Sequence, residues 1–451
     1  MAARAFVILA AGQGTRMKSA LPKVMHAVAG LPILGHVVAA ARGAGASRIV
    51  VVSAPAMDSL RGYVSSLGAE NAIQDKPLGT GHAALAARAL LGDFEGSLLV
   101  NNGDMPLALP SMMEESLASA EAAGLSLVAF RPKDPAAYGR VLRNADGTLD
   151  RIVEFKDATA AQRAVDLCCA GTYSAASARK FFEWAAQLKN DNAQKEYYLP
   201  EVPLIAKADG VPCAITLADE ITVMGMNSRA ELADAEFHMQ QRLRRAALDA
   251  GVGMTAPETV FLSYDTVLES DAHIGPYVVF GPGVTVKSGA QIKSHSHLEG
   301  AVVGERALVG PYARLRPGAD IEQDVHIGNF VEVKNTRVEK GAKANHLTYL
   351  GDARVGPGAN IGAGTIICNY DGFDKHRTDI GANAFIGSNT ALVAPVTVAD
   401  GVYVGAGSVV TKSMTPDSLV VTRAEQKEIP GWAEKFRARK RAEKAAKTKG
   451  K

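Results

Sequence analysis

The chain has two groups of polar side chains whose types and spacing suit chemistry. The first follows the apolar run FVILA, where the segment AAGQGTRM brings Gly12 and Gly14 together and Arg16 and Lys23 follow. Closely spaced glycines leave backbone N–H groups open to an anion. A dinucleotide-binding fingerprint would need glycine where Met17 stands, and a P-loop would need Gly-Lys followed by Ser or Thr. The pattern therefore favours a phosphate-binding loop of neither common family.

The second group surrounds His346 in KANHLTYLGD, with Tyr349 and Asn360 close behind it. Histidine suits general base catalysis because its pKa lies near neutral pH. A lone histidine is more often a packed or surface residue. The interpretation therefore depends on the elements that hold these residues.

From residue 5 to about residue 225, short apolar runs alternate with segments of helical spacing. The runs are AFVILA (5–10), RIVVVSA (48–54), GSLLVNNGD (96–104) and LSLVAF (125–130), and the helical segments include 31–45 and 79–92. This alternation predicts an α/β domain with a mainly parallel sheet covered by helices. Ligands of such sheets bind beyond the carboxyl ends of strands, where AAGQGTRM and Asp104 both lie.

Residues 227–250 show the spacing of one long amphipathic helix, which we expect to connect two domains. Its apolar side would consist of Leu232, Ala235, Met239, Leu243 and Ala246. Asn227 or Ser228 would cap its start.

Beyond residue 250, aliphatic or aromatic side chains recur at six-residue steps. The runs are 274, 280, 286, 292 and 298; 303 to 333; 355, 361 and 367; and 380 to 410. A step of six fits one short strand and one tight corner per hexad, and three hexads close a coil of about 18 residues. The pattern predicts a prism of stacked coils around an aliphatic column. The step from Ile367 to Ile380 is longer, so CNYDGFDKHRTD should project as a loop.

Composition limits the class of protein. No run of apolar residues is long enough to span a membrane, and the first residues lack the basic start, apolar core and cleavage site of a secretory signal, so we expect none. Four cysteines without metal-ligand spacing suit a reduced, cytoplasmic protein. Residues 435–451 carry nine Lys or Arg and one Glu, against a net charge of +2 for the whole chain. Such a tail could touch nucleic acid or an anionic membrane, but a disordered, solubilising terminus is the simpler expectation.

Together these motifs resemble one family. LAAGQGTRM and LPKVMHAVAGLPIL resemble the sugar-nucleotidyltransferase signature, whereas NHLTYLGD and NIGAGTIICNYDG resemble the left-handed β-helix acetyltransferases. Both in this order resemble the bacterial bifunctional N-acetylglucosamine-1-phosphate uridylyltransferase/glucosamine-1-phosphate N-acetyltransferase family, over about residues 5–430.

The resemblance implies a fold and a domain plan. It implies a Rossmann-like mixed α/β sheet in a nucleotidyltransferase domain (1–226), a connecting helix (227–250), a left-handed parallel β-helix of hexapeptide repeats (251–430) and a basic, disordered tail (431–451). It further implies a cytoplasmic homotrimer that shares acetyltransferase sites between subunits, without nucleic acid and without membrane insertion.

The resemblance also implies two reactions. Acetyl-CoA acetylates glucosamine 1-phosphate, and the product then takes a uridylyl group from UTP with Mg²⁺, which releases pyrophosphate. The resulting UDP-N-acetylglucosamine would supply peptidoglycan and lipopolysaccharide synthesis.

For uridylyl transfer, the resemblance implies Arg16 and Lys23 as catalytic cations and Asp104 and Asn227 as metal ligands. The residues that would bind UTP or UDP-N-acetylglucosamine are Leu9, Ala10, Ala11, Gly12, Lys23, Gln74, Gly79, Thr80, Asp104, Tyr138, Gly139, Glu154 and Asn227.

For acetyl transfer, the resemblance implies His346 as the base. Arg316, Lys334, Tyr349 and Asn360 would bind glucosamine phosphate. Acetyl-CoA would contact Ala363, Asn369, Tyr370, Ser388, Ala406 and Arg423.

Two positions depart from the family pattern. Cys169 stands where the family commonly has Asn near the sugar, and Pro77 stands where Gln is frequent. Because a thiol bonds weakly, the first change puts sugar affinity or selectivity in doubt.

Two other functions remain open at this point. One is a nucleotidyltransferase with a purely structural β-helix, which gives His346 no role. The other is a non-enzymatic scaffold, which leaves Arg16, Lys23, Asp104 and Asn227 unexplained.

Overall fold

The computed structural model describes residues 3–135, 138–192 and 194–449, with the backbone alone for 447–449. The described chain forms two compact units. The first comprises residues up to Ala250 and the segment Val260–Thr266, and the second comprises Gly251–Thr259 and the residues from Val267 onward.

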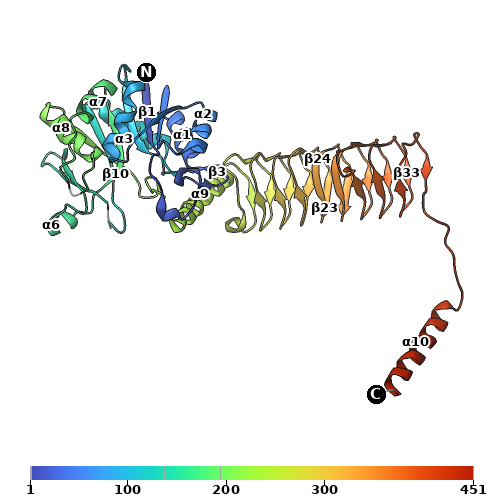
Figure 1. Cartoon of the computed structure of the whole chain (residues 1–451). Coiled ribbons are helices and arrows are strands. Elements are labelled where there is room, and N and C mark those ends of the chain that lie inside the picture. Colours follow the sequence, from blue (N-terminus) through green and yellow to red (C-terminus); the bar gives the residue numbers. More distant parts are fainter. Residues whose placement is uncertain (1–2, 136–137, 193, 450–451) are drawn as a thin grey trace. The chain divides into compact units, whose positions relative to one another are not determined.

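The first unit is built on a nine-stranded mixed sheet (Figure 1). Its main path runs in the order β11-β7-β10-β6-β1-β4-β5. These strands are β1 (Arg4–Leu9), β4 (Arg48–Ser53), β5 (Glu70–Ile73), β6 (Ser97–Asn102), β7 (Leu125–Phe130), β10 (Cys168–Ala175) and β11 (Cys213–Leu217). Neighbouring strands are parallel except at β10, which is antiparallel to both β6 and β7. A hairpin of β8 (Arg140–Arg143) and β9 (Leu149–Val153) pairs with β10.

Both faces of this sheet are buried, which explains its almost continuous apolar strands. In β1, Ala5 and Val7 belong to one core cluster, whereas Phe6 and Ile8 belong to another. The helices of this sheet are α1 (Ile33–Gly43), α2 (Asp58–Ser66), α3 (Thr80–Ala86), α4 (Arg88–Leu91), α5 (Pro110–Ala123), α6 (Ala160–Arg163), α7 (Ala178–Ala185) and α8 (Val202–Ala208). Shorter elements are the 3-10 turns Thr15–Met17, Lys23–Met25 and Leu199–Glu201 and the strands β2 (Ala27–Val28) and β3 (Leu31–Pro32). The predicted strands are therefore confirmed, and the segment 79–92 forms two helices.

Helix α9 (Arg229–Asp249) begins with a capping box, in which the Glu231 N–H donates to the Ser228 hydroxyl and the Ser228 N–H donates to the Glu231 carboxylate. Ala235 and Met239 are buried, but Ala246 is exposed and lies off the predicted apolar side. The helix packs within the first unit and is thus part of that unit, not a separate connector.

The segment 260–266 also differs from the expected domain plan. Val260 and Leu262 are buried in the first unit, where Gln240 of α9 exchanges two hydrogen bonds with the Leu262 backbone, at 2.7 and 2.9 Å. The Tyr264 N–H donates to the Ala29 carbonyl at 2.8 Å. The chain therefore enters the second unit, returns to the first, and leaves it again.

The second unit is a left-handed parallel β-helix whose strand pairs are all parallel, apart from one isolated antiparallel bridge in its projecting loop (Figure 1). One ten-stranded sheet consists of β12 (Gly253–Met254), β14 (His273–Ile274), β17 (Gln291–Ile292), β20 (Leu308–Val309), β23 (His326–Asn329), β25 (Lys343–His346), β27 (Asn360–Ile361), β30 (Phe385–Ile386), β33 (Tyr403–Val404) and β35 (Leu419–Val420). A fourteen-stranded sheet consists of β13 (Val267–Leu268), β15 (Val279–Phe280), β16 (Thr285–Val286), β18 (His297–Leu298), β19 (Ala301–Val303), β21 (Arg314–Leu315), β22 (Ala319–Ile321), β24 (Glu332–Val338), β26 (Tyr349–Val355), β28 (Ile366–Cys368), β29 (Thr378–Ile380), β31 (Ala391–Val393), β32 (Val396–Val398) and β34 (Val409–Val410). A 3-10 turn, Pro257–Thr259, lies near the start.

The predicted hexad side chains form the core of this unit. Each of them, from Ile274 to Val410, is at most 4% exposed. The predicted projecting loop is confirmed, because no named strand lies between β28 and β29 and Phe373 is 93% exposed.

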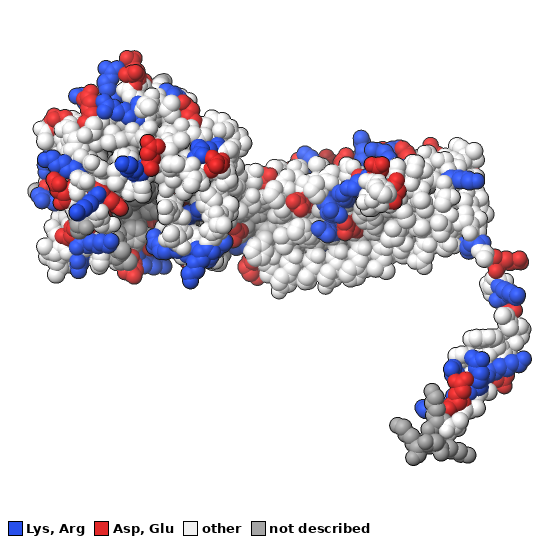
Figure 2. All heavy atoms as spheres, in the orientation of Figure 1, with Lys and Arg blue, Asp and Glu red and all other residues white. Residues whose placement is uncertain are grey.

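The sequence predicts a disordered tail over 431–451, but residues 432–449 of it form a helix, and residues 450 and 451 lie outside the described residues. Helix α10 (Trp432–Lys449) is rich in the strong helix formers Ala, Lys, Arg and Glu. The rings of Trp432 and Phe436 stack one turn apart at 5.1 Å, and Lys440 pairs with Glu443. Its side chains are exposed where described, and Figure 2 shows Lys and Arg along it. None of the described helices is long and apolar enough to cross a membrane.

Candidate active sites

Two adjoining cavities open at the carboxyl ends of β1 and β6 in the first unit. Their volumes are about 320 and 390 Å³, and they share the lining residues Thr80, Asn102, Asp104 and Glu196. The two strand ends meet because Leu9 pairs with Asn102 in the parallel register of β1 and β6. We name them after the ligands that the sequence analysis expects there, as the nucleotide cavity (320 Å³) and the sugar cavity (390 Å³).

The structure brings most of the predicted nucleotide-binding residues to the nucleotide cavity. They are Leu9, Ala10, Ala11, Gly12, Lys23, Gln74, Gly79, Thr80 and Asp104. Arg16 is exposed on the turn Thr15–Met17 and does not line either cavity. Gly79 has a φ of +102°, and a Cβ there would lie 2.7 Å from the Tyr197 carbonyl oxygen, so this turn requires glycine.

Lys23 lies at the centre of the predicted phosphate and metal site. Its Nζ donates to Asp104 Oδ2 and, at 3.1 Å, to Asn227 Oδ1. Gly14, at a φ of +62°, allows Lys23 to pack against the loop, because a Cβ on Gly14 would lie 2.7 Å from the Lys23 Cβ. The ammonium, the carboxylate and the amide therefore converge on one point.

This donor set fits Mg²⁺. Asp104 and Asn227 present two oxygens to one cation, the Lys23 ammonium, and Mg²⁺ is usually held by one or two protein oxygens together with substrate phosphates. The described residues contain no cluster of three His, Cys, Asp or Glu that would bind a metal without substrate.

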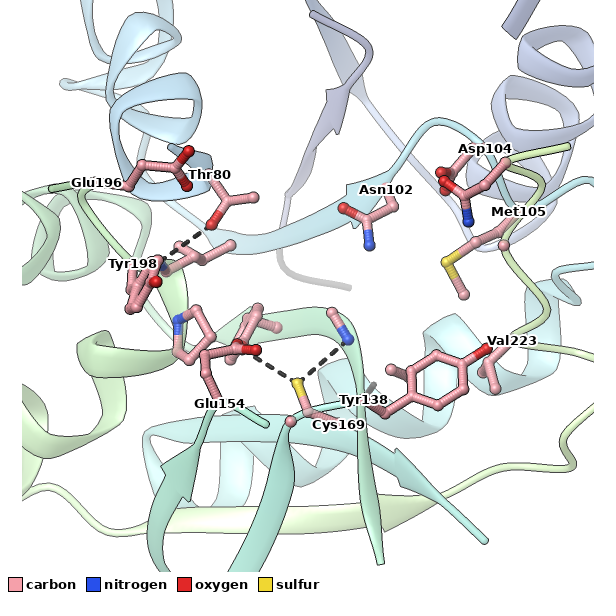
Figure 3. A pocket seen from close by; sticks show the side chains of 18 of the residues that line it. Thr80, Asn102, Asp104, Met105, Tyr138, Glu154, Cys169, Glu196, Tyr198 and Val223 are labelled. Atoms are coloured by element: carbon pink, nitrogen blue, oxygen red, sulfur yellow. Dashed lines mark hydrogen bonds between the residues drawn. The ribbon is translucent and has the colours of Figure 1, made fainter. Parts of the chain in front are cut away.

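The sugar cavity contains Tyr138, Gly139 and Glu154, as predicted, and Asn227 (Figure 3). Burial raises the pKa of the Glu154 carboxyl, and nearby Asp157 adds to the shift. Burial also raises the pKa of Tyr138. The Tyr138 ring meets Phe130 edge to face at 5.0 Å, which fixes its position on the cavity wall.

Cys169 lines this cavity, and its thiol makes hydrogen bonds within the protein. Its Sγ lies 3.2 Å from the Tyr173 hydroxyl and 3.3 Å from the Gly171 nitrogen, which donates to it (Figure 3). Burial raises the pKa of Cys169 to about 11, so the group is a neutral thiol at neutral pH. The cavity wall is therefore weakly polar at this position.

Sequence reasoning missed Asn102 and Glu196, which line both cavities. Asn102 ends the same strand that leads to Asp104, so its position in NNGD was a usable signal. Glu196 belongs to a distant loop, and only the tertiary fold brings it to the site.

The second unit holds His346 at the end of β25, where it is exposed. Its Nδ1 lies 2.7 Å from Asn329 Oδ1 on the neighbouring strand β23. Because an amide oxygen can only accept, Nδ1 carries the hydrogen and the lone pair lies on Nε2. Asn329, which the sequence analysis missed, thus selects the tautomer of His346.

Lys334 on β24 lies close to two further cations, Lys375 and Arg316. The Nζ of Lys334 lies beside that of Lys375, which lowers the pKa of Lys334 because Lys375 can donate a hydrogen bond to the neutral amine and repels the charged form. Arg316 donates to Glu332 Oε1 at 2.7 Å, and that bond raises the pKa of Arg316. Two positive charges this close repel each other, and an anion bound between the two lysines would relieve that repulsion. Lys375 lies on the projecting loop and was not predicted.

The other predicted residues of this unit lie on successive coils. Tyr349 pairs with Glu332, and Asn360 pairs with Lys343. The loop residue Asn369 is buried and donates to Asp352. Tyr370 is 60% exposed, on the same loop.

Four of the six residues predicted to contact acetyl-CoA lie on successive coils, namely Ala363, Ser388, Ala406 and Arg423. The Asn389 N–H donates to the Ala363 carbonyl, and the Gly407 N–H donates to the Ser388 carbonyl, so these positions repeat from coil to coil. Arg423 donates to the Ala406 carbonyl.

Comparison with known proteins agrees with both halves. Residues 6–197 match the MobA-like NTP transferase domain, and residues 377–412 match the bacterial transferase hexapeptide family of six repeats. The chain is 53% identical over 445 residues to the bifunctional protein GlmU of Maricaulis maris, with 98% of each chain covered. It is 50% identical over 446 residues to the bifunctional protein GlmU of Paramagnetospirillum magneticum, again with 98% of each chain covered. With this identity over nearly its whole length, the chain belongs to the GlmU family of bifunctional enzymes.

Proposed function

We propose that this enzyme makes UDP-N-acetylglucosamine in two steps, one in each unit. The second unit acetylates glucosamine 1-phosphate with acetyl-CoA, and the first unit couples the product to UTP and releases pyrophosphate. The observation that carries the proposal is the convergence of Lys23, Asp104 and Asn227 where two cavities meet. One cavity then takes the nucleotide and the other takes the sugar.

In uridylyl transfer, an oxygen of the sugar phosphate attacks the α-phosphorus of UTP and pyrophosphate leaves. Both reactants are anions, so catalysis consists mainly of positioning and charge neutralisation. Lys23 offsets the charge at the reacting phosphates, and the exposed Arg16 reaches the triphosphate. Gly12 and its neighbours let the nucleotide approach the backbone.

Mg²⁺ belongs to this proposal through Asp104 and Asn227, whose oxygens already hold the Lys23 ammonium. When bound, the ion supplies positive charge at the phosphate oxygens. Lys23 would then leave Asp104 and turn its ammonium to the substrate.

The sugar is held by Tyr138, Gly139 and Glu154. As an ionised carboxylate, Glu154 accepts hydrogen bonds from sugar hydroxyls. Its raised pKa means that this binding weakens as the pH falls, beginning above the usual range of a glutamate.

In acetyl transfer, the Nε2 of His346 takes a proton from the attacking amine of glucosamine 1-phosphate. The amine forms a bond to the acetyl carbon, and the thiolate of CoA leaves. Arg316, Lys334 and Lys375 hold the sugar phosphate, and Tyr349 and Asn360 orient the sugar.

Acetyl-CoA lies along the row of Ala363, Ser388 and Ala406. Arg423 meets a CoA phosphate at its end. Asn369 and Tyr370 contribute from the projecting loop, where Asn369 holds the loop to the coil through Asp352.

We further propose a cytoplasmic homotrimer whose subunits share the acetyltransferase sites. The free state of all four cysteines supports a reducing compartment. In Figure 2 charged side chains gather along the upper edge and near the middle of the β-helix, whereas its lower part carries few, which supports self-association through that uncharged part.

The decisive assay supplies glucosamine 1-phosphate, acetyl-CoA, UTP and Mg²⁺ and follows free thiol and pyrophosphate separately. We expect both products, with thiol release first. His346→Ala should abolish thiol release while pyrophosphate release from N-acetylglucosamine 1-phosphate continues. Intact acetyl transfer in that variant would instead show that the β-helix is structural.

A further inference from the structure

Gln74 lies on the wall of the nucleotide cavity and is hydrogen-bonded to His82, a residue that has no role in the proposed reaction. Gln74 is 7% exposed, and its Nε2 lies 3.0 Å from the Gly79 carbonyl oxygen and 3.3 Å from Nδ1 of His82. His82 lies in the first turn of α3. One amide nitrogen therefore faces two partners.

The chemistry of these partners fixes the orientation of the amide. A carbonyl oxygen only accepts, so the Gln74 atom beside Gly79 is the nitrogen and not the oxygen. Its second hydrogen is then directed at His82, whose Nδ1 must be the unprotonated nitrogen of the ring. Both amide hydrogens are in use, and the Gln74 Oε1 has no hydrogen-bond partner within the described part of the chain.

The His82 ring is itself held in place. It packs against the Tyr197 ring, with centroids 6.2 Å apart. Tyr197 is fixed by two backbone hydrogen bonds at 2.8 Å, from its N–H to Leu78 and from Gly81 to its carbonyl. The loop of Gly79 and the ring of His82 thus form one rigid support behind Gln74.

We propose that His82 is a positioning residue for base selection. By holding the Gln74 amide, it presents an acceptor, Oε1, to the base. Uracil offers a matching N–H at N3, whereas cytosine has a lone pair there and would meet Oε1 as a second acceptor. The inference rests on the proposed binding of UTP and extends it to a residue that would not touch the nucleotide.

The test compares kcat/KM for UTP and CTP in pyrophosphate release. His82→Phe keeps a ring against Tyr197 but removes the accepting nitrogen. We expect the preference for UTP over CTP to fall about three- to tenfold, the value of one ordinary hydrogen bond. His82→Asn, whose Oδ1 can accept in place of Nδ1, should restore the preference.

If His82 had only a structural role, His82→Phe would lower activity with UTP and CTP equally and leave their ratio unchanged, and that result would overturn the inference. A double variant gives a second test. If adding His82→Phe to Gln74→Ala changes the UTP-to-CTP ratio further, His82 acts other than through Gln74, and the inference is again overturned. Acetyl transfer reports on folding and should be unchanged. A native enzyme that releases no pyrophosphate from UTP would overturn the proposed function itself, and this inference with it.

Discussion

At the residue scale, the first site centres on the Lys23 ammonium, which lies between two side-chain oxygens that the proposed reaction assigns to Mg²⁺. Lys23 bonds to Asp104 and to Asn227, and all three side chains lie in the lining of the two cavities. The ammonium of Lys23 offsets the negative charge of Asp104. In the proposed reaction, this charge would be redistributed when the triphosphate and Mg²⁺ bind.

Replacing Lys23 tests this balance. Lys23→Ala leaves Asp104 uncompensated beside the phosphates, so we expect kcat/KM for uridylyl transfer to fall on the order of a hundredfold or more. Acetyl transfer should be unchanged. Lys18→Ala removes an exposed lysine of the same loop and serves as the control. Equal losses in both variants would mean that only the net charge of the loop matters.

Asn329 is a second residue that we expect to influence a reaction indirectly, in this case through His346. Asn329→Ala removes the acceptor for Nδ1–H of His346, which frees the ring to rotate and to change tautomer. We expect kcat for acetyl transfer to fall about tenfold, with the KM for acetyl-CoA little changed. Asn329→Asp keeps an accepting oxygen and should retain most of the rate. A fully active alanine variant would exclude this role.

The Cys169 thiol allows a test by chemical labelling. Its pKa of about 11 lies roughly two units above that of an ordinary thiol, so the reactive thiolate is about a hundredfold scarcer in the folded protein. Iodoacetamide at pH 8 should therefore label Cys169 far more slowly in the folded enzyme than in urea, with labelling speeding up as the pH rises. Peptide mass spectrometry measures both rates. Fast labelling of the folded enzyme would show that the thiol is not buried as described.

The sequence predicted residues for the two reactions, but not how their side chains are paired. Asp104 and Asn227 are far apart in the chain, and nothing local predicts that Lys23 lies between them. Asn329 and Lys375 were missed because their relevance depends on neighbouring coils and on the course of one loop.

At the element scale, the β-helix derives its stability from one repeated side chain per strand. Ile327 points into the column and is fully buried, whereas its neighbour His326 points outward. Each coil packs against the coil before it and the coil after it, so a cavity in one coil removes contacts with both neighbours.

Ile327→Ala should reduce the free energy of unfolding by about 2–5 kcal/mol, the usual loss for a buried aliphatic side chain. His326→Ala, one position away on the same strand, should change it by under about 1 kcal/mol. Urea unfolding monitored by circular dichroism gives both values. Similar losses in the two variants would contradict the assignment of inner and outer faces.

Elements whose buried apolar side chains recur at a regular spacing could be predicted from the sequence, because burial on one side of a strand or coil sets that spacing. The four strand runs of the first unit and the hexads of the second are of this kind. Helix α10 was not predictable from burial, since its described side chains are exposed and its helicity depends on intrinsic propensity and on the contact of Trp432 with Phe436. The packing of α9 within the first unit could not be predicted, because part of it comes from residues 260–266, which follow the helix in the chain.

At the scale of the whole molecule, the two units are not consecutive pieces of chain. Residues 260–266 complete the first unit after the chain has begun the second. They contribute the buried side chains of Val260 and Leu262 and the backbone partners of Gln240.

A fragment that ends at residue 250 should therefore be less stable than one that ends at residue 266. We expect a difference of about 3–5 kcal/mol in the free energy of unfolding, from two apolar side chains and a few hydrogen bonds. Urea unfolding of both fragments measures it, and uridylyl transfer under native conditions checks that each has folded. Fragments of equal stability would show that the returning segment is only an appendage.

The returning segment also sets an order of events during synthesis. A ribosome delivers the chain from its N-terminus, and domains generally fold as they emerge. Here residues 251–259 must leave the exit tunnel before the first unit receives its last piece. The first unit thus lacks its last segment until residues 251–259, which belong to the second unit, have been made. A graft of the first unit onto another protein must carry residues 260–266 with it.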